Sequence, residues 1–237
     1  MRPSRLPTLL EDALGSVPVA QLDQVSRFYA TDTEYIPALY DVTMSVPRAA
    51  LTVVSGLSGS GKSSLLRLVA GLDVPTTGTV TLSGVELTTA SRRVRRRLRR
   101  SLVAYVFPQP SDNLLEYLTA RAHLRLAAEL KRVDLTDGGE EILRLVDLWP
   151  RRNLMPHQLS GGEQQRLAFA QALIGHPELI VTDEPTSDLD DVSGSAITRL
   201  ITEMVGLGVG VLAATHDRQL SSAAEQLLPL AEGRLAT

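Results

Sequence analysis

Residues 56–63 read Gly56-Leu57-Ser58-Gly59-Ser60-Gly61-Lys62-Ser63, and no other segment constrains the architecture as strongly. The pattern G-x-x-x-x-G-K-[ST] follows a strand-like run at 51–55 and opens a predicted helix at 64–70. In that setting the backbone N–H groups of the loop, at the N-terminus of a helix, converge on phosphate oxygens. Lys62 would place a charge near the β- and γ-phosphates, and Ser63 would offer a hydroxyl to Mg²⁺. A flexible Gly/Ser linker, the alternative, needs no lysine at this position.

The predicted nucleotide contacts therefore come from the loop and the first residue after it. They are Gly56, Ser58, Gly59, Ser60, Gly61, Lys62, Ser63 and Ser64.

A second segment, at residues 179–184, is an apolar run that ends in two acids, Asp183 and Glu184. At the end of a buried strand, Asp183 would reach the Mg²⁺ and Glu184 would polarise a water molecule for hydrolysis. The alternative for this segment alone is an acidic loop after a strand. The phosphate-binding pattern favours the metal and hydrolysis roles.

Strand-like and helix-like segments alternate along most of the chain. Strands are expected at 42–46, 51–54, 79–82, 102–107, 179–181 and 210–214, and helices at 164–174 and 192–205. Residues 114–148 show helical spacing, interrupted at 137–139, and predict a helical insert. This alternation predicts an α/β fold with a mostly parallel sheet. Residues 1–19 are punctuated by prolines and are expected to be an N-terminal extension, with a short helix at 9–14.

The composition is that of a globular protein. The chain has 237 residues, of which 43% are hydrophobic and 22% charged, and its net charge is −3. These values disfavour a disordered chain and a general nucleic-acid binder. The absence of cysteine excludes disulfides, thiolate zinc sites and a thiol nucleophile. No apolar run approaches the roughly 20 residues of a membrane span, so a cytosolic location is expected.

A third motif precedes the helix predicted at 164–174. Ser160, Gly161, Gly162 and Glu163 offer a hydroxyl and bare N–H groups at a helix N-terminus, which would form a second anion site. The serine and the glutamate three residues later also fit an ordinary capping box. Both interpretations remain open for the motif alone.

Together with the phosphate loop and the Asp-Glu strand, the segment 159–166 resembles the signature of ATP-binding cassette (ABC) ATPases. The resemblance covers residues 20–237. It implies a P-loop NTPase core, a small antiparallel β subdomain and an α-helical insert, with ATP and Mg²⁺ as cofactors. The implied division is an extension at 1–19, the first core part with the β subdomain at 20–107, the α-helical subdomain with the glutamine-loop region and the signature at 108–165, and the second core part at 166–237.

The resemblance also implies a head-to-tail dimer, in which the phosphate loop of one subunit and the signature of a second subunit clamp one ATP. Tyr29 lies where the family stacks an aromatic on adenine, Asp190 in the acidic position of the loop after the catalytic glutamate, and His216 at the switch histidine. In this pattern Glu184 and His216 are the catalytic residues. The alternatives are a packed strand aromatic for Tyr29, a helix N-cap for Asp190 and a strand-end histidine for His216.

One departure from the family pattern affects the metal site. The glutamine that usually follows an apolar-Phe pair is replaced by Pro108, and Gln109 comes one position late. Either Gln109 contacts Mg²⁺ through an altered loop, or that contact is missing. Proline also stiffens the junction between the core and the helical insert.

Seven arginines occur in the nine residues 92–100. A solvated surface helix is one interpretation, and contact with anionic lipid headgroups is the other. Nucleic acid is not expected, because only 4% of the residues are aromatic and stacking partners are few.

The family resemblance implies an ATPase that drives separate membrane permease subunits from the cytoplasmic face of the membrane, docking near 109–117. The second cassette would be the same chain or a paralogue. Residues 88–100, 156–159 and 183–187 look like the group of lipoprotein-release, macrolide-efflux and antimicrobial-peptide-resistance ATPases, which favours export or mechanotransmission. The alternative is a soluble ABC ATPase that acts on nucleic acid or ribosomes. A GTPase or small-molecule kinase is disfavoured, because no Asn-Lys-x-Asp motif is present.

Overall fold

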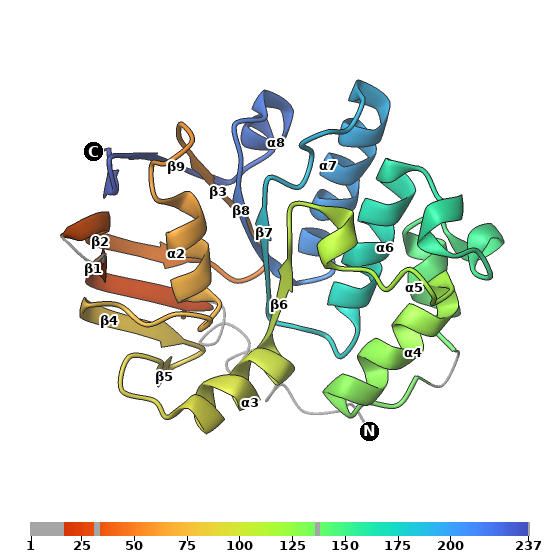
Figure 1. Cartoon of the computed structure of the whole chain (residues 1–237), viewed down its shortest axis with the longest axis horizontal. Coiled ribbons are helices and arrows are strands. Elements are labelled where there is room, and N and C mark those ends of the chain that lie inside the picture. Colours follow the sequence, from red (N-terminus) through yellow and green to blue (C-terminus); the bar gives the residue numbers. More distant parts are fainter. Residues whose placement is uncertain (1–16, 31–33, 136–137, 237) are drawn as a thin grey trace, which may run out of the picture.

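The computed structural model describes residues 17–30, 34–135 and 138–236. Within them the chain forms two β-sheets and a set of helices that cover them (Figure 1). The helix expected at 9–14 lies outside the described residues. The α/β class predicted from the sequence is confirmed.

The central sheet has six strands in the order β10-β9-β3-β8-β7-β6. Its parallel strands are β3 (Leu51–Ser55), β6 (Val103–Val106), β7 (Leu179–Asp183), β8 (Gly210–Ala214) and β9 (Gln226–Ala231), and β10 (Arg234–Leu235) pairs antiparallel to β9. Every residue of β7 and β8 is buried. Continuous apolar strands of this kind are expected where helices cover both faces of a parallel sheet.

The second sheet is antiparallel, with the order β2-β1-β4-β5. Its strands are β1 (Ala20–Ala30), β2 (Tyr35–Val46), β4 (Thr77–Leu82) and β5 (Val85–Glu86). The sequence predicted only the ends of β2 and β4, because their exposed halves lack a continuous apolar run. This sheet is the small antiparallel subdomain that the resemblance implied.

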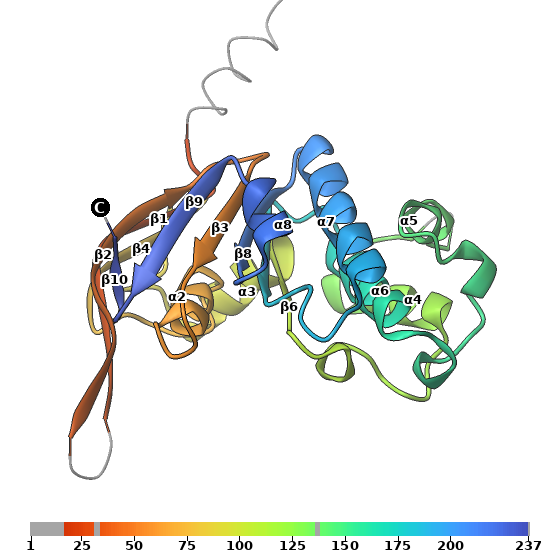
Figure 2. The same ribbon diagram turned by 90° about the horizontal axis from the view of Figure 1, so that it is seen from above.

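Helices pack on both faces of the central sheet. They are α2 (Lys62–Val69), α3 (Arg92–Leu102), α6 (Gly161–Leu173), α7 (Asp191–Gly206) and the short α8 (Arg218–Ser222). The helical insert contains α4 (Ala120–Lys131) and α5 (Glu140–Leu145), with 3₁₀ turns at Pro110–Asp112, Trp149–Arg151 and Pro156–Gln158. The insert and the antiparallel sheet lie at opposite ends of the molecule (Figure 2). The boundary expected between residues 165 and 166 falls inside α6, which is one continuous helix.

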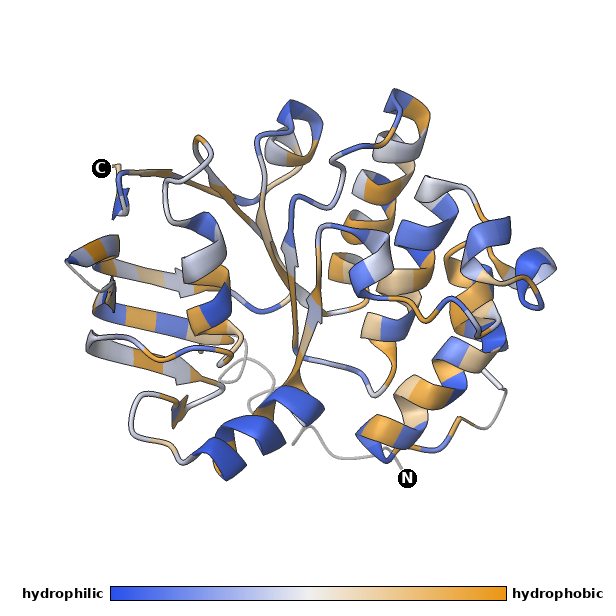
Figure 3. Cartoon of the chain, viewed as in Figure 1, coloured by the Kyte–Doolittle hydropathy of each residue, from blue (hydrophilic) through white to orange (hydrophobic). Residues whose placement is uncertain are grey.

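Two hydrophobic cores lie on opposite faces of the central sheet. Alternate residues of β3 divide between them: Val53 packs in the core beneath α4, α6 and α7, and Val54 in the core shared with α2 and the antiparallel sheet. This alternation follows from the two-residue period of a strand. Apolar residues consequently line the interior stripes of the helices, whereas α3 is predominantly hydrophilic (Figure 3). Both faces of the central sheet are thus packed. The polar groups lie at the edge of the sheet where the parallel strands end.

Candidate nucleotide-binding site

The phosphate loop connects the end of β3 to the start of α2, and two of its glycines are required by close backbone approach. A Cβ at Gly56 would lie 2.2 Å from the Leu230 carbonyl oxygen, and one at Gly61 would lie 2.2 Å from the Ala38 carbonyl oxygen. Gly61 also has φ of 105°. It occupies the N-cap position of α2 without a side-chain cap, so the first N–H groups of α2 can serve an anion.

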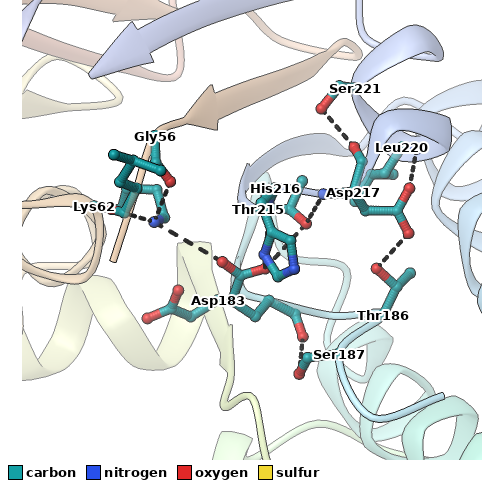
Figure 4. Close-up of polar contacts among 12 residues, drawn as sticks. Gly56, Lys62, Asp183, Thr186, Ser187, Thr215, His216, Asp217, Leu220 and Ser221 are labelled. Atoms are coloured by element: carbon teal, nitrogen blue, oxygen red, sulfur yellow. Dashed lines mark hydrogen bonds and ion pairs between the residues drawn. The ribbon is translucent and has the colours of Figure 1, made fainter. Parts of the chain in front are cut away.

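Lys62 extends back along its own loop. Its side chain is 9% exposed, and Nζ donates hydrogen bonds to the carbonyl oxygens of Gly56 (2.8 Å) and Leu57 (3.1 Å). Figure 4 shows Lys62 beside Gly56. The same Nζ lies 3.9 Å from Glu184 Oε1. The ammonium group is therefore held beside the loop and next to the carboxylate that ends the Asp-Glu strand.

Ser63 and Asp183 meet across the sheet edge. The Ser63 hydroxyl donates a hydrogen bond of 2.5 Å to Asp183 Oδ2. Burial raises the pKa of Asp183, and the neighbouring Glu184 carboxylate adds to the rise, while the Ser63 hydrogen bond and Lys62 oppose it. A hydroxyl and a carboxylate are the hard oxygen donors that Mg²⁺ prefers, so these two side chains fit a magnesium site.

Glu184 is held by contacts from the end of β8 and from the two residues that follow it. Its backbone has a φ of 45°, and its N–H donates to the Ala214 carbonyl oxygen (2.8 Å). The Thr215 hydroxyl donates to Glu184 Oε2 (3.1 Å). His216 Nδ1 lies 3.0 Å from the same oxygen, whereas the imidazole is otherwise 76% exposed. The carboxylate is thus oriented from β8 and faces the opening of the site.

These groups surround one cavity of about 900 Å³. The predicted site residues that line it are Tyr29, Gly56, Ser58, Gly59, Gly61, Lys62, Ser63, Ser64, Asp183, Glu184 and His216. Ser60 does not line it, because its buried Oγ is turned into the fold and has no hydrogen-bond partner among the described residues. The structure thus brings the phosphate loop, the Asp-Glu strand and the switch histidine to one cleft.

Tyr29 reaches the cavity from β1. Its hydroxyl donates to Asp73 Oδ2 (3.1 Å) and lies 3.3 Å from Ser64 Oγ. The Arg27 guanidinium lies 4.6 Å from the ring centroid and also binds Asp73. The ring is therefore held in place at the cavity wall, and its stacking on adenine stays a prediction.

Gln109 is not part of this cavity. Pro108 lines it instead, and Gln109 Nε2 donates to Asp188 Oδ2 (3.1 Å) on the exposed side of the loop. The Gln109 side chain is thus directed towards the loop that follows Glu184, and its contact with Mg²⁺ stays a prediction. Asp190 also lies outside the cavity, where its Oδ1 accepts from the N–H groups of Val192 and Ser193 as the N-cap of α7.

The signature motif lies at the start of α6, away from the cavity. Ser160 Oγ accepts from the Glu163 N–H (3.3 Å), and Glu163 Oε2 accepts from the Ser160 N–H (2.8 Å). Arg151 Nε donates to Glu163 Oε1 (2.6 Å). Although burial opposes it, hydrogen bonds from Ser160 and Arg151 lower the pKa of Glu163. Within one chain, Ser160, Gly161, Gly162 and Glu163 are a helix cap and contact no phosphate site.

Sequence reasoning missed several residues that support the site. Thr215 orients Glu184, Asp73 and Arg27 hold Tyr29, and Thr186 donates to Asp217 Oδ2 (2.8 Å) beside the switch histidine. Only Thr215 carried a usable signal. It follows β8 directly, and the carboxyl ends of adjacent parallel strands meet at the same sheet edge.

A phosphate loop that faces a buried aspartate at the end of β7, followed directly by a second acid, defines the class of P-loop nucleotide hydrolases. Comparison with known proteins identifies the family within this class. The family model for ABC transporters matches residues 39–187. An uncharacterized ABC transporter ATP-binding protein of Methanocaldococcus jannaschii is 34% identical over 214 residues, which are 89% of this chain and 95% of that protein. The chain belongs to the ABC transporter family, as an ATP-binding cassette with ATPase chemistry.

Two solved structures of ABC proteins are similar to this chain. The ATP-binding cassette MJ0796, solved as a dimer in a post-hydrolysis state bound to ADP and Pi, has a TM-score of 0.82 at 30% identity, covering 92% of this chain and 97% of that chain. CbiO1 of Clostridium perfringens, part of the ABC transporter complex cbiONQ, has a TM-score of 0.83 at 24% identity, covering 93% of this chain and 87% of that chain. The second likeness shows the shared fold.

Proposed function

We propose that this chain hydrolyses ATP as one half of a dimer and thereby moves separate membrane subunits. One observation carries the proposal: the cavity holds the phosphate loop and both acids, but the signature at 160–163 lies outside it. A head-to-tail partner would bring its own signature over the open side of this cavity. The relative MJ0796 was solved as a dimer with ADP and Pi, which supports dimer formation. The partner is a second copy or a paralogous cassette.

In this proposal each side chain has a distinct task. The loop N–H groups and Lys62 bind the phosphates, and Tyr29 stacks on adenine. Glu184, oriented by Thr215, positions the attacking water, and His216 contacts the γ-phosphate. Ser63 and Asp183 would hold Mg²⁺, which would neutralise phosphate charge. Catalysis then consists of positioning and charge stabilisation, without a covalent intermediate.

Contact with the membrane subunits is proposed for the segment 109–117. Tyr117 is 71% exposed, and Phe107 and Leu115 expose their side chains nearby in the sequence. Apolar side chains at the surface favour a protein partner at this place. In the described part of the chain, no helix combines the length and the apolarity that crossing a bilayer requires. By its family, the cassette would act from the cytoplasmic face, attached to permease subunits in the membrane.

We also propose the kind of work that the cassette performs and a contact with lipid. The resemblance to the lipoprotein-release, macrolide-efflux and peptide-resistance group favours export or mechanotransmission as the work performed. The arginines of α3 would contribute contact with anionic lipid headgroups. Such contact is worth roughly 1 kcal/mol for each basic residue near the surface.

The decisive experiment is Glu184→Gln. The amide keeps the shape of the carboxylate but cannot polarise water, so the variant should bind ATP, cease turnover and accumulate as a dimer. Light scattering with and without ATP measures the dimer, and phosphate release measures turnover. Glu203→Gln, an exposed position on α7, is the matched control and should behave like the parent. A Glu184→Gln variant that hydrolyses at the parent rate would contradict the proposal.

A further inference from the structure

A groove of about 420 Å³ runs between α3 and the turn that follows α2. One of its walls is formed by four arginines of α3. They are Arg92, Arg95, Arg96 and Arg99. Their spacing of three and four residues places them on a single face of the helix. Residues 71–74 form the opposite wall, and the groove shares no lining residue with the nucleotide cavity.

The positive charge of this wall is not neutralised within the described chain. Asp73 is the only carboxylate that lines the groove, and its oxygens are already engaged. Oδ2 accepts from Arg27 Nε (2.9 Å) and from the Tyr29 hydroxyl (3.1 Å), and Oδ1 accepts from the Val74 N–H (2.8 Å). No salt bridge between the described residues involves an arginine of α3.

Two of the four guanidinium groups are anchored to backbone. Arg95 Nη1 donates to the Ala90 carbonyl oxygen (3.1 Å), and Arg99 Nη1 donates to the Gly71 carbonyl oxygen (2.6 Å). Burial lowers the pKa of Arg99, and the charges of Arg95 and Arg96 lower it further. The helix therefore holds like charges close together at the groove, at an electrostatic cost that an anion would relieve.

We propose that this groove binds a phosphate group, delivered either by an anionic lipid headgroup or by a soluble phosphate or pyrophosphate. Fixed guanidinium groups with unused donors match the geometry of phosphate oxygens. Where the source is a lipid, the inference rests on the lipid contact proposed above and sharpens it, because a single site replaces a diffuse attraction. Phosphate binding itself depends on neither the dimer nor ATP turnover.

The helix offers a matched control for this site. Arg92→Gln/Arg96→Gln removes two charges from the groove face, whereas Arg93→Gln/Arg97→Gln removes two charges from the adjoining face of the same helix. All four side chains are exposed and make no side-chain hydrogen bond within the described residues. Both double variants should therefore fold, with thermal midpoints equal to that of the parent.

The first measurement is calorimetric titration with inorganic pyrophosphate after the phosphate loop has been saturated with ADP. The groove variant should lose roughly tenfold or more in pyrophosphate affinity, and the control variant should change by less than about threefold. Equal losses in both variants, or no pyrophosphate binding by the parent, would overturn the proposal, because α3 would then be only a diffuse positive surface.

The second measurement identifies the source of the phosphate. Flotation with vesicles of phosphatidylcholine containing phosphatidylglycerol is compared with phosphatidylcholine alone. If the groove variant alone loses binding to the anionic vesicles, a lipid headgroup occupies the groove. If vesicle binding is unchanged while pyrophosphate affinity falls, the ligand is a soluble phosphate. ATP turnover, measured in parallel, reports separately on the proposed ATPase cycle.

Discussion

The phosphate loop and the signature motif both place glycines at a helix N-terminus. The two motifs differ in how closely the rest of the chain approaches Gly61 and Gly161. Gly61 has a left-handed backbone, and a Cβ there would lie 2.2 Å from the Ala38 carbonyl oxygen. Gly161 is helical, and a Cβ there would meet only Leu189 Cδ2, at an ordinary 3.7 Å. The first glycine is required by the fold of the protomer. The second is not, and in the proposed dimer its lack of a side chain would leave room for the partner's nucleotide.

The two regions differ in charge as well. Beside the phosphate loop, a buried lysine, the last carboxylate of β7 and the carboxylate that follows it converge on one cavity. At the signature, the Glu163 carboxylate is satisfied by its own cap and by Arg151. We propose that the groups around the cavity form one complete half-site, and that the signature, which is only a helix cap within its own chain, acts on the nucleotide of a partner cassette. The following variants test this contrast, beginning with the largest expected effect.

Lys62→Met should weaken ATP affinity the most. The substitution keeps an aliphatic chain but removes the ammonium group, and hydrogen bonds to a charged phosphate are strong, so we expect a loss of roughly 100-fold or more. Fluorescent nucleotide titration measures it. The only other lysine, Lys131, also donates to two carbonyl oxygens, those of Ala172 and Ile174, but lies outside the cavity. Lys131→Met should bind ATP normally, and unchanged affinity in Lys62→Met would refute the phosphate-loop assignment.

Gly161→Asp tests the other side of the comparison. The protomer has room for the side chain, and an acid in the first turn suits the helix dipole, so the free energy of unfolding should change by less than about 1 kcal/mol. In the dimer the same carboxylate would approach the γ-phosphate of the partner's ATP. Turnover should then fall roughly 100-fold while ATP binding by the monomer is retained.

The control is Gly206→Asp, which adds the same charge at the end of α7, where a Cβ meets nothing within 4 Å. It should leave turnover unchanged. Full hydrolysis by Gly161→Asp, measured as phosphate release at saturating ATP, would show that the signature glycine has no role across a dimer.

Thr215→Val should produce a smaller effect inside the complete half-site. It removes the hydroxyl that orients Glu184 and preserves the shape of the side chain, so kcat should fall roughly tenfold with KM unchanged. Thr52→Val is the matched control, because Thr52 is equally buried and its hydroxyl donates to Gln226, far along β3 from the site. A loss of kcat that is equal in both variants would mean that the effect is structural.

The sequence predicted the parts of the site that have a fixed local pattern. The phosphate loop and the Asp-Glu strand could be placed because each is a short run beside a buried strand. The position of the Gln109 side chain could not be predicted, because its direction depends on the loop in which Pro108 takes the usual place of the glutamine. Asp73 and Arg27 were also beyond reach. They lie 46 residues apart and meet at Tyr29 only through the pairing of the antiparallel sheet with the turn after α2.

The smallest expected effect is on the pH dependence of stability. It concerns Lys131, which, like Lys62, donates to two carbonyl oxygens. Burial lowers the pKa of Lys131 from 10.5 to about 8, so between these values the folded protein binds fewer protons than the unfolded chain. The contribution of this residue to stability must therefore rise as the pH rises from about 8 towards 10.5, with a slope of at most about 1.4 kcal/mol per pH unit. Urea unfolding at several pH values measures it. Lys131→Met should flatten this part of the profile, and a wild-type stability that falls over the same range while the variant does not would reverse the assigned sign.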